Sequence, residues 1–212
     1  LAAAVSFILD HYPRLLSDCL SFADRIGEGA TVLIGGQARS GKSTFAATLR
    51  DALRGRGKEA VVLCVDRWLH SEPQRGQGVL GRYDMVALQA LVNSLANRAQ
   101  RPSNLMLSGY HKLRRERVEA VESIALGPSD VVIFEGTVAL ALETNAGAET
   151  HRFHVEIDEE ARKRRIVNEY RLRGFGEADA LPVYRVRRDD EFPAIEAMAG
   201  RGDRIKMPNA AS

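Results

Sequence analysis

GQARSGKST, residues 36–44, is the stretch that decides the fold class of this 212-residue chain. It matches the pattern G-x-x-x-x-G-K-[S/T], in which a loop turns its backbone N–H groups inward around phosphate oxygens. Gly36 and Gly41 permit the backbone angles that such a loop requires. We expect this loop to contact a nucleotide through Gly36, Ala38, Arg39, Ser40, Gly41, Lys42, Ser43 and Thr44.

The neighbourhood of the loop supports this interpretation. Residues 31–35 (TVLIG) have the character of a buried strand, and residues 43–54 have helical spacing. A helix that begins at Lys42 would add the positive end of its dipole to the phosphate site. In such loops the lysine reaches the β- and γ-phosphates and the following hydroxyl holds Mg²⁺, here Lys42 and Ser43. The alternative is a glycine-rich turn that binds no nucleotide, and the strand-to-helix context argues against it.

Outside the loop, apolar runs of strand length alternate with helix-length segments. We expect an α/β, three-layer P-loop NTPase fold with a mainly parallel central sheet, because continuous β-branched runs indicate strands covered on both faces. Further strands are expected at 60–65, 131–134, 151–157 and 204–207, and helices at 3–11, 14–26, 84–99, 116–124, 158–173 and 192–199, with a long loop at 67–83. We expect one domain: N-terminal helices in 1–28, a core in 30–157, a lid region in 158–190, and a final helix and strand in 191–212.

Composition excludes several classes. Thirty basic and 28 acidic residues give a formal net charge of +2, too balanced to indicate a nucleic-acid partner. The longest apolar stretch, residues 1–9, is about half the roughly 20 residues of a membrane-spanning helix and lacks a basic flank. Two cysteines indicate a reducing compartment, so we expect a cytoplasmic protein, with Cys64 a buried apolar residue.

Two acidic residues follow strands of the expected sheet. Asp66 comes directly after residues 60–65, and Glu135 comes directly after residues 131–134. Because parallel strands end at one edge, we expect both carboxylates to lie near the phosphate loop. There one could accept a proton from an attacking hydroxyl and the other could serve Mg²⁺. The alternative is that either residue only caps the helix or turn that follows it.

A third group of residues is basic. Arg162, Lys163, Arg164, Arg165, Arg171 and Arg173 lie on one expected helix. Arginine suits phosphate oxygens and charge that develops during phosphoryl transfer. The alternative is a solvated face paired with Glu159, Glu160 and Glu169, which we favour for most of them. Two or three are expected to face the nucleotide from a helical lid.

Taken together, the chain resembles the uridine kinase and phosphoribulokinase group of P-loop small-molecule kinases. The resemblance covers residues 30–208. It rests on the phosphate loop, Asp66, the Arg82-Tyr83-Asp84 segment before a helix, DVVIFEG at 130–136, the lid-like stretch 164–174 and GDRI at 202–205.

The resemblance implies roles for individual residues. Asp66 would be the general base, Lys42 would stabilise the transferred phosphoryl group, and Arg165 would act with it. Ser43 and Glu135 would serve Mg²⁺, and Arg164 and Arg165 would close over ATP. The residues implied in acceptor binding are Asp66, Arg82, Asp84, Tyr110, Arg115 and Arg117.

The sequence departs from the uridine kinase pattern on the acceptor side. Arg67-Trp68 follows Asp66, where the family usually has a small or polar residue and then Phe-Tyr; His111 follows Tyr110, and Arg115 stands where the family has a histidine. The acceptor therefore stays open among nucleosides, sugars, sugar phosphates and small acids. The many basic residues here could favour a phosphorylated or carboxylated acceptor, or form a solvated surface.

The leading hypothesis is an ATP- and Mg²⁺-dependent kinase with a small-molecule acceptor and no nucleic-acid or membrane partner. The sequence allows a homo-oligomer but does not decide the oligomeric state. The alternative is a nucleotide-binding switch, although the N/T-K-x-D segment that reads guanine in GTPases does not occur. A nucleic-acid-processing ATPase ranks last, because no basic tract with interleaved aromatic residues is present.

Overall fold

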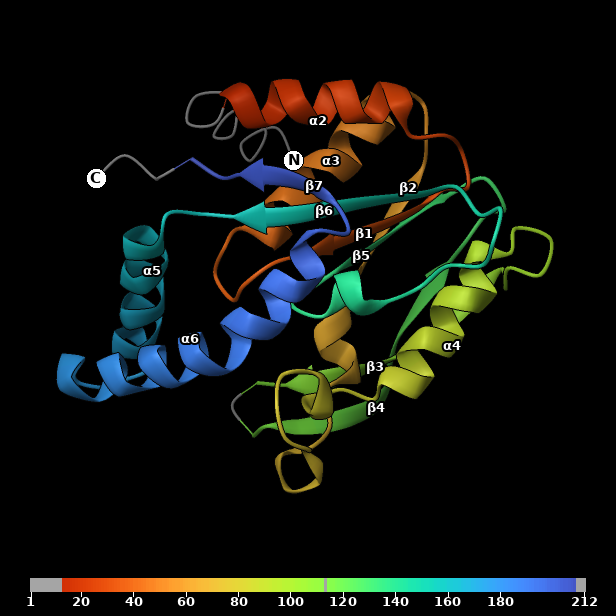
Figure 1. The fold of residues 1–212 in the computed structure, drawn as a ribbon. Coiled ribbons are helices and arrows are strands. Elements are labelled where there is room, and N and C mark those ends of the chain that lie inside the picture. Colours follow the sequence, from red (N-terminus) through yellow and green to blue (C-terminus); the bar gives the residue numbers. More distant parts are fainter. Residues whose placement is uncertain (1–12, 113, 209–212) are drawn as a thin grey trace.

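A five-stranded parallel sheet organises the computed structural model, which describes residues 13–112 and 114–208. The strand order is β2-β5-β1-β6-β7, and every pairing is parallel (Figure 1). The strands are β1 (Thr31–Gly35), β2 (Ala60–Cys64), β5 (Val131–Glu135), β6 (Thr150–Glu156) and β7 (Asp203–Lys206). Each lies within one residue of its expected position, so the predicted parallel α/β fold is confirmed.

Helices cover both faces of this sheet and form the outer layers. α2 (Pro13–Arg25) and α3 (Lys42–Gly55) pack on one face (Figure 1). α4 (Met85–Ala96) and the C-terminal part of α6 (Glu177–Ala199) pack on the other. α5 (Glu159–Leu172) and the first turns of α6 lie beyond the carboxyl ends of the strands, where a lid was expected.

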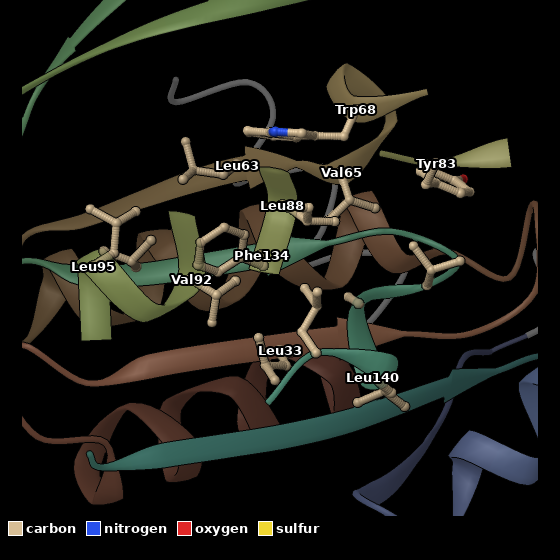
Figure 2. Close-up of a cluster of buried hydrophobic side chains, with 14 of the residues drawn as sticks. Leu33, Leu63, Val65, Trp68, Tyr83, Leu88, Val92, Leu95, Phe134 and Leu140 are labelled. Atoms are coloured by element: carbon tan, nitrogen blue, oxygen red, sulfur yellow. The ribbon is translucent and has the colours of Figure 1, made fainter. Parts of the chain in front are cut away.

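Two apolar clusters separate the layers because each central strand is buried on both sides. In β1, Leu33 faces the α4 side, whereas Val32 and Ile34 face α2 and α3. Figure 2 shows the α4 cluster, with Phe134 of β5 against Leu88 and other α4 side chains. Burial of a side chain of this size contributes roughly 1.5–3 kcal/mol, so the clusters fix the sheet and with it the strand ends.

A two-stranded antiparallel hairpin corrects one expectation. Residues 116–124 were expected to be helical, but they form β4 (Glu116–Ala125), which pairs with β3 (Asn104–His111). The register brings Tyr110 opposite Arg117 and His111 opposite Glu116. The apolar residues of 116–124 are also compatible with helical spacing, and pairing with β3 decides in favour of the strand.

The long loop at 67–83 contains three short 3-10 helices, Val65–Trp68, Glu72–Gln74 and Leu80–Arg82, of which the first begins before the loop. A single bridge between Leu69 and Tyr83 closes it. Trp68 and Tyr83 are both buried in the α4 cluster (Figure 2), so the tryptophan packs beneath the loop.

Apart from the segment 116–124, the described helices agree with expectation except at the C-terminal end. Asp84 and Asp158 cap α4 and α5, accepting hydrogen bonds from the N–H groups of Ala87 (3.0 Å) and Ala161 (3.1 Å). α6 begins at Glu177 rather than near residue 192, so the expected lid and C-terminal regions share one helix. The expected helix at 3–11 lies outside the described residues. Within the described chain, no helix is long and apolar enough to cross a membrane.

Candidate active site

The phosphate loop joins the end of β1 to the start of α3, as the sequence predicts. Gly36 has a φ of +138°, and a Cβ atom there would lie 2.2 Å from the backbone oxygen of Val155. Gly41 has a φ of +104° and is the N-cap of α3. Both positions require glycine, because a side chain would be strained or would collide with the neighbouring strand.

Lys42 is buried inside this loop. Its Nζ donates a hydrogen bond to the backbone oxygen of Gln37, 2.7 Å away. Burial lowers the pKa of Lys42, while the charges of Glu135, Asp66 and Glu191 partly oppose that shift. The Ser40 hydroxyl is also buried and has no hydrogen-bond partner among the described residues. An unsatisfied buried hydroxyl and a buried ammonium group in one loop fit a loop built around phosphate oxygens.

Ser43 and Glu135 meet beside the loop. The Ser43 hydroxyl donates a hydrogen bond to Oε1 of Glu135, 3.2 Å away. In the sheet, Glu135 pairs with Ile34 of β1 and Cys64 of β2, so three strand ends converge there. No group of three or more His, Cys, Asp or Glu side chains within the described ranges could hold a metal by itself. A hydroxyl and one carboxylate suit Mg²⁺, which takes most remaining ligands from phosphates and water.

Cys64 is only half-buried, not fully buried as expected. Desolvation, together with the charges of Asp66 and Glu135, raises the pKa of this thiol to about 12. The thiol therefore stays protonated near neutral pH and is a poor nucleophile.

Asp66 lies just after β2 and is partly exposed. Its Oδ1 accepts a hydrogen bond from the Tyr83 hydroxyl at 3.3 Å, and its Oδ2 is 3.8 Å from Nζ of Lys112. Burial, followed by the charge of Asp66, raises the pKa of Tyr83 well above its usual value, so the phenol remains a donor. A carboxylate held by one phenol and open to solvent can accept a further proton.

The other residues expected to bind the acceptor are already engaged in contacts with side chains other than Asp66. Asp84 forms an ion pair with Arg117 at 3.5 Å, in addition to capping α4. Arg82 pairs with Asp190 and lies 3.7 Å from Glu191, both on α6. Tyr110 accepts a hydrogen bond from Arg75, and Arg115 pairs with Glu72.

The lid helix α5 contacts the phosphate loop through two residues. Arg39 of the loop pairs with Glu169, and Nη1 of Arg165 donates to the Arg39 backbone oxygen at 3.4 Å. Arg164 is exposed and makes no hydrogen bond or ion pair with any described residue.

The remaining basic residues of this helix mostly pair with its own acids, as favoured above. Arg162 binds Glu159, Lys163 lies 3.5 Å from Glu160, and Arg173 pairs with Glu169.

Two site residues were not assigned a role from the sequence. Tyr83 positions Asp66, and Glu191 lies close enough to influence both Lys42 and Tyr83. Tyr83 belongs to a segment that supported the family resemblance, so its position offered a signal. Glu191 offered none, because it stands in an acidic run that resembles a solvated helix end.

Comparisons with known proteins agree with this geometry at the level of the fold. No family model matches the sequence, and no curated protein matches it either. Solved structures do match. A candidate fructose transport system kinase from Silicibacter sp. TM1040 is 19% identical, with a TM-score of 0.65 over 92% of this chain and 98% of that one.

The chain has the fold of the P-loop small-molecule kinases. A candidate uridine kinase from Bacillus stearothermophilus is 19% identical, with a TM-score of 0.55 over 91% of this chain and 99% of that one. D-glycerate 3-kinase from Cryptococcus neoformans is 14% identical, with a TM-score of 0.59 over 91% of this chain and 92% of that one. The resemblance to the uridine kinase group is thus confirmed for the fold.

Proposed function

We propose that this P-loop protein is an ATP- and Mg²⁺-dependent kinase that phosphorylates a hydroxyl group of a small metabolite. The observation that carries the proposal is the convergence at one sheet edge of Lys42, the Ser43–Glu135 pair and the Asp66 carboxylate. The similarity in fold to small-molecule kinases supports it. Their named substrates differ, so the proposal covers nucleosides, sugars, sugar phosphates and small acids.

Each residue has a chemical task in this proposal. The acceptor oxygen forms a bond to the γ-phosphorus, the bond from that phosphorus to the bridging oxygen of ADP breaks, and Asp66 takes the hydroxyl proton. Tyr83 keeps the Asp66 carboxylate in place through its hydrogen bond. Lys42 and Arg165 neutralise charge on the phosphoryl oxygens. Ser43 and Glu135 would hold Mg²⁺, which neutralises the phosphates when bound.

The proposal is tested by following ADP release from Mg-ATP with a panel of acceptors. We expect one acceptor to raise the rate sharply, and Asp66→Asn to lower that rate about 100-fold or more, the usual contribution of a general base. Asp66→Asn should retain Mg-ATP binding, measured by calorimetry. Asp24→Asn, which removes an exposed carboxylate on α2 paired with Arg56, serves as the matched control.

Two results would contradict the proposal in different ways. Full turnover in Asp66→Asn excludes this residue as the base. A slow release of ADP that no acceptor accelerates, together with tight Mg-ATP binding, indicates a nucleotide switch instead of a kinase.

A further inference from the structure

The cations on the acceptor side of the site are largely neutralised by acids. The basic residues there could have favoured a phosphorylated or carboxylated acceptor, but most of them have a carboxylate partner. The pairs are Arg67 with Glu122, Arg82 with Asp190, Lys112 with Asp66, Arg114 with Glu116, Arg115 with Glu72, and Arg117 with Asp84. An anionic acceptor would have to compete with these carboxylates for each cation.

Arg75 has neutral partners, but it too is engaged. Its guanidinium donates to the backbone oxygen of His70 and to the Tyr110 hydroxyl, and it lies 5.6 Å from the centre of the Tyr110 ring. Through these contacts Arg75 holds the Tyr110 side chain in place. The region therefore offers an incoming anion little uncompensated positive charge.

Glu191 differs from these paired cations, because it is a buried carboxylate with an oxygen that accepts no hydrogen bond from the described residues. The residue is 5% exposed, and its Oε2 has no hydrogen-bond partner in the described chain. Its only ion pair there is with Arg82, at 3.7 Å from Oε1. Arg82, its ion-pair partner, is the residue next to Tyr83, and the charge of Glu191 acts on both Tyr83 and Lys42, so the carboxyl lies near the acceptor side of the site. Buried polar atoms are almost always satisfied, so a donor from a ligand or water belongs at this oxygen.

We propose that the acceptor is a neutral polyhydroxylated molecule and that the Glu191 carboxylate binds one of its hydroxyl groups. The inference rests on the proposed kinase function and narrows it. Hydroxyl groups donate to carboxylates, and Asp66, Asp84 and Glu191 supply carboxylates around the acceptor side. Glu191, whose ion-pair partner Arg82 lies 3.7 Å away and whose Oε2 accepts no hydrogen bond from the described residues, would in addition repel a phosphate ester or a carboxylic acid. A free sugar and the ribose of a nucleoside share this chemistry.

The first test compares acceptors that differ by one anionic group. ADP release is measured with ribose and ribose 5-phosphate, uridine and uridine monophosphate, and glycerol and glycerate. We expect kcat/KM to favour a neutral member over its anionic partner by about tenfold or more, the effect of one hydrogen bond or repulsive contact. Ribose against uridine then separates a free sugar from a nucleoside. This test uses the unaltered protein, so it does not depend on the folding of any variant.

The second test addresses Glu191 directly. Glu191→Gln keeps the shape and removes the charge, so the KM of the preferred neutral acceptor should rise about tenfold or more. The KM for Mg-ATP should change much less, because Glu191 acts on Lys42 only through its charge. Asp189→Asn removes an exposed carboxylate two residues away on the same helix, paired with Arg188, and should change neither value. Thermal melting of both variants checks that they fold.

The outcomes separate this inference from the proposed function. Preference for an anionic partner overturns the neutral acceptor but leaves a kinase. An unchanged acceptor KM in a folded Glu191→Gln variant overturns the role of Glu191. No stimulation by any acceptor of either kind contradicts the kinase proposal itself.

Discussion

At the scale of single residues, the site holds a charge that the fold alone does not stabilise. Burial lowers the pKa of Lys42, and the attraction of Glu135, Asp66 and Glu191 does not fully offset that effect. The protonated ammonium is therefore less favourable in the folded chain than in water. Phosphate oxygens in the loop would supply the missing compensation, so we infer that Lys42 serves binding more than stability.

This imbalance predicts the behaviour of Lys42→Met. Without nucleotide, the free energy of unfolding should stay within about 1 kcal/mol of the unaltered protein, because an apolar side chain replaces a poorly compensated buried charge. With Mg-ATP at about 100 times its Kd, the unaltered protein should gain roughly 2.7 kcal/mol, and the variant should lose most of that gain. Thermal melting with and without Mg-ATP measures both. Lys206→Met, at an exposed position on β7, should behave like the unaltered protein; an equal gain in Lys42→Met would exclude a role in nucleotide binding.

At the scale of elements, α5 and α6 are joined by one buried arginine. Arg162 is 1% exposed, donates two hydrogen bonds to Glu159 at 2.8 Å and lies over the ring of Tyr184, whose hydroxyl donates to the same carboxylate at 2.6 Å. Burial would raise the pKa of Glu159, but the hydrogen bonds from Arg162 and Tyr184 outweigh it and hold that pKa below its usual value. The lid helices thus depend on this contact.

Glu159→Gln should therefore destabilise the pair of helices. We expect a loss of about 2 kcal/mol, because Arg162 keeps its burial but loses its anionic partner. Hydrogen exchange should show reduced protection of the backbone amides in α5 and α6, with little change in the central sheet. Glu160→Gln, which breaks an exposed pair with Lys163, should cost under about 0.5 kcal/mol. Equal protection in the two variants would mean that the apolar contacts of Ile166 and Ala180 keep α5 and α6 together without the arginine.

The elements also show where sequence reasoning succeeds and where it fails. The strands of the parallel sheet could be predicted because both faces are buried, which produces continuous apolar runs. The segment 116–124 could not, because alanine, glutamate and the spacing of its apolar residues suit a helix, and only pairing with β3 decides the outcome. The start of α6 was missed because Pro182 and Pro193 lie inside the helix.

The same division applies to the site. Local sequence was enough to predict that four site residues lie at one edge of the sheet. Lys42 and Ser43 belong to the phosphate loop motif, and Asp66 and Glu135 stand at the ends of strands. Glu191 approaches Lys42 only because α6 crosses the carboxyl ends of the strands (Figure 1). No local pattern encodes such a contact, since it depends on the packing of α6 against the sheet.

At the scale of the whole molecule, His154 occupies the point where sheet, α6 and phosphate loop meet. It pairs with Gly35 in the sheet, is buried, and its Nδ1 has no hydrogen-bond partner among described residues. Burial lowers the pKa of His154; Glu196 and Glu156 oppose this shift, and Arg204 and Lys42 add to it. A histidine that is harder to protonate in the folded chain than in the unfolded chain makes global stability depend on pH.

The sign of this dependence can be stated. Between the lowered folded pKa and the unfolded value of about 6.5, the unfolded chain binds more protons, so stability rises with pH and is lost as pH falls below about 6.5. The slope from this one group is at most about 1.4 kcal/mol per pH unit.

Urea unfolding at a series of pH values from 7.5 to 5, spanning that window, should show a shallower slope for His154→Leu than for the unaltered protein. Identical slopes in His154→Leu and the unaltered protein would show that other groups control acid stability, and that the junction of β6 with α6 tolerates a charged histidine.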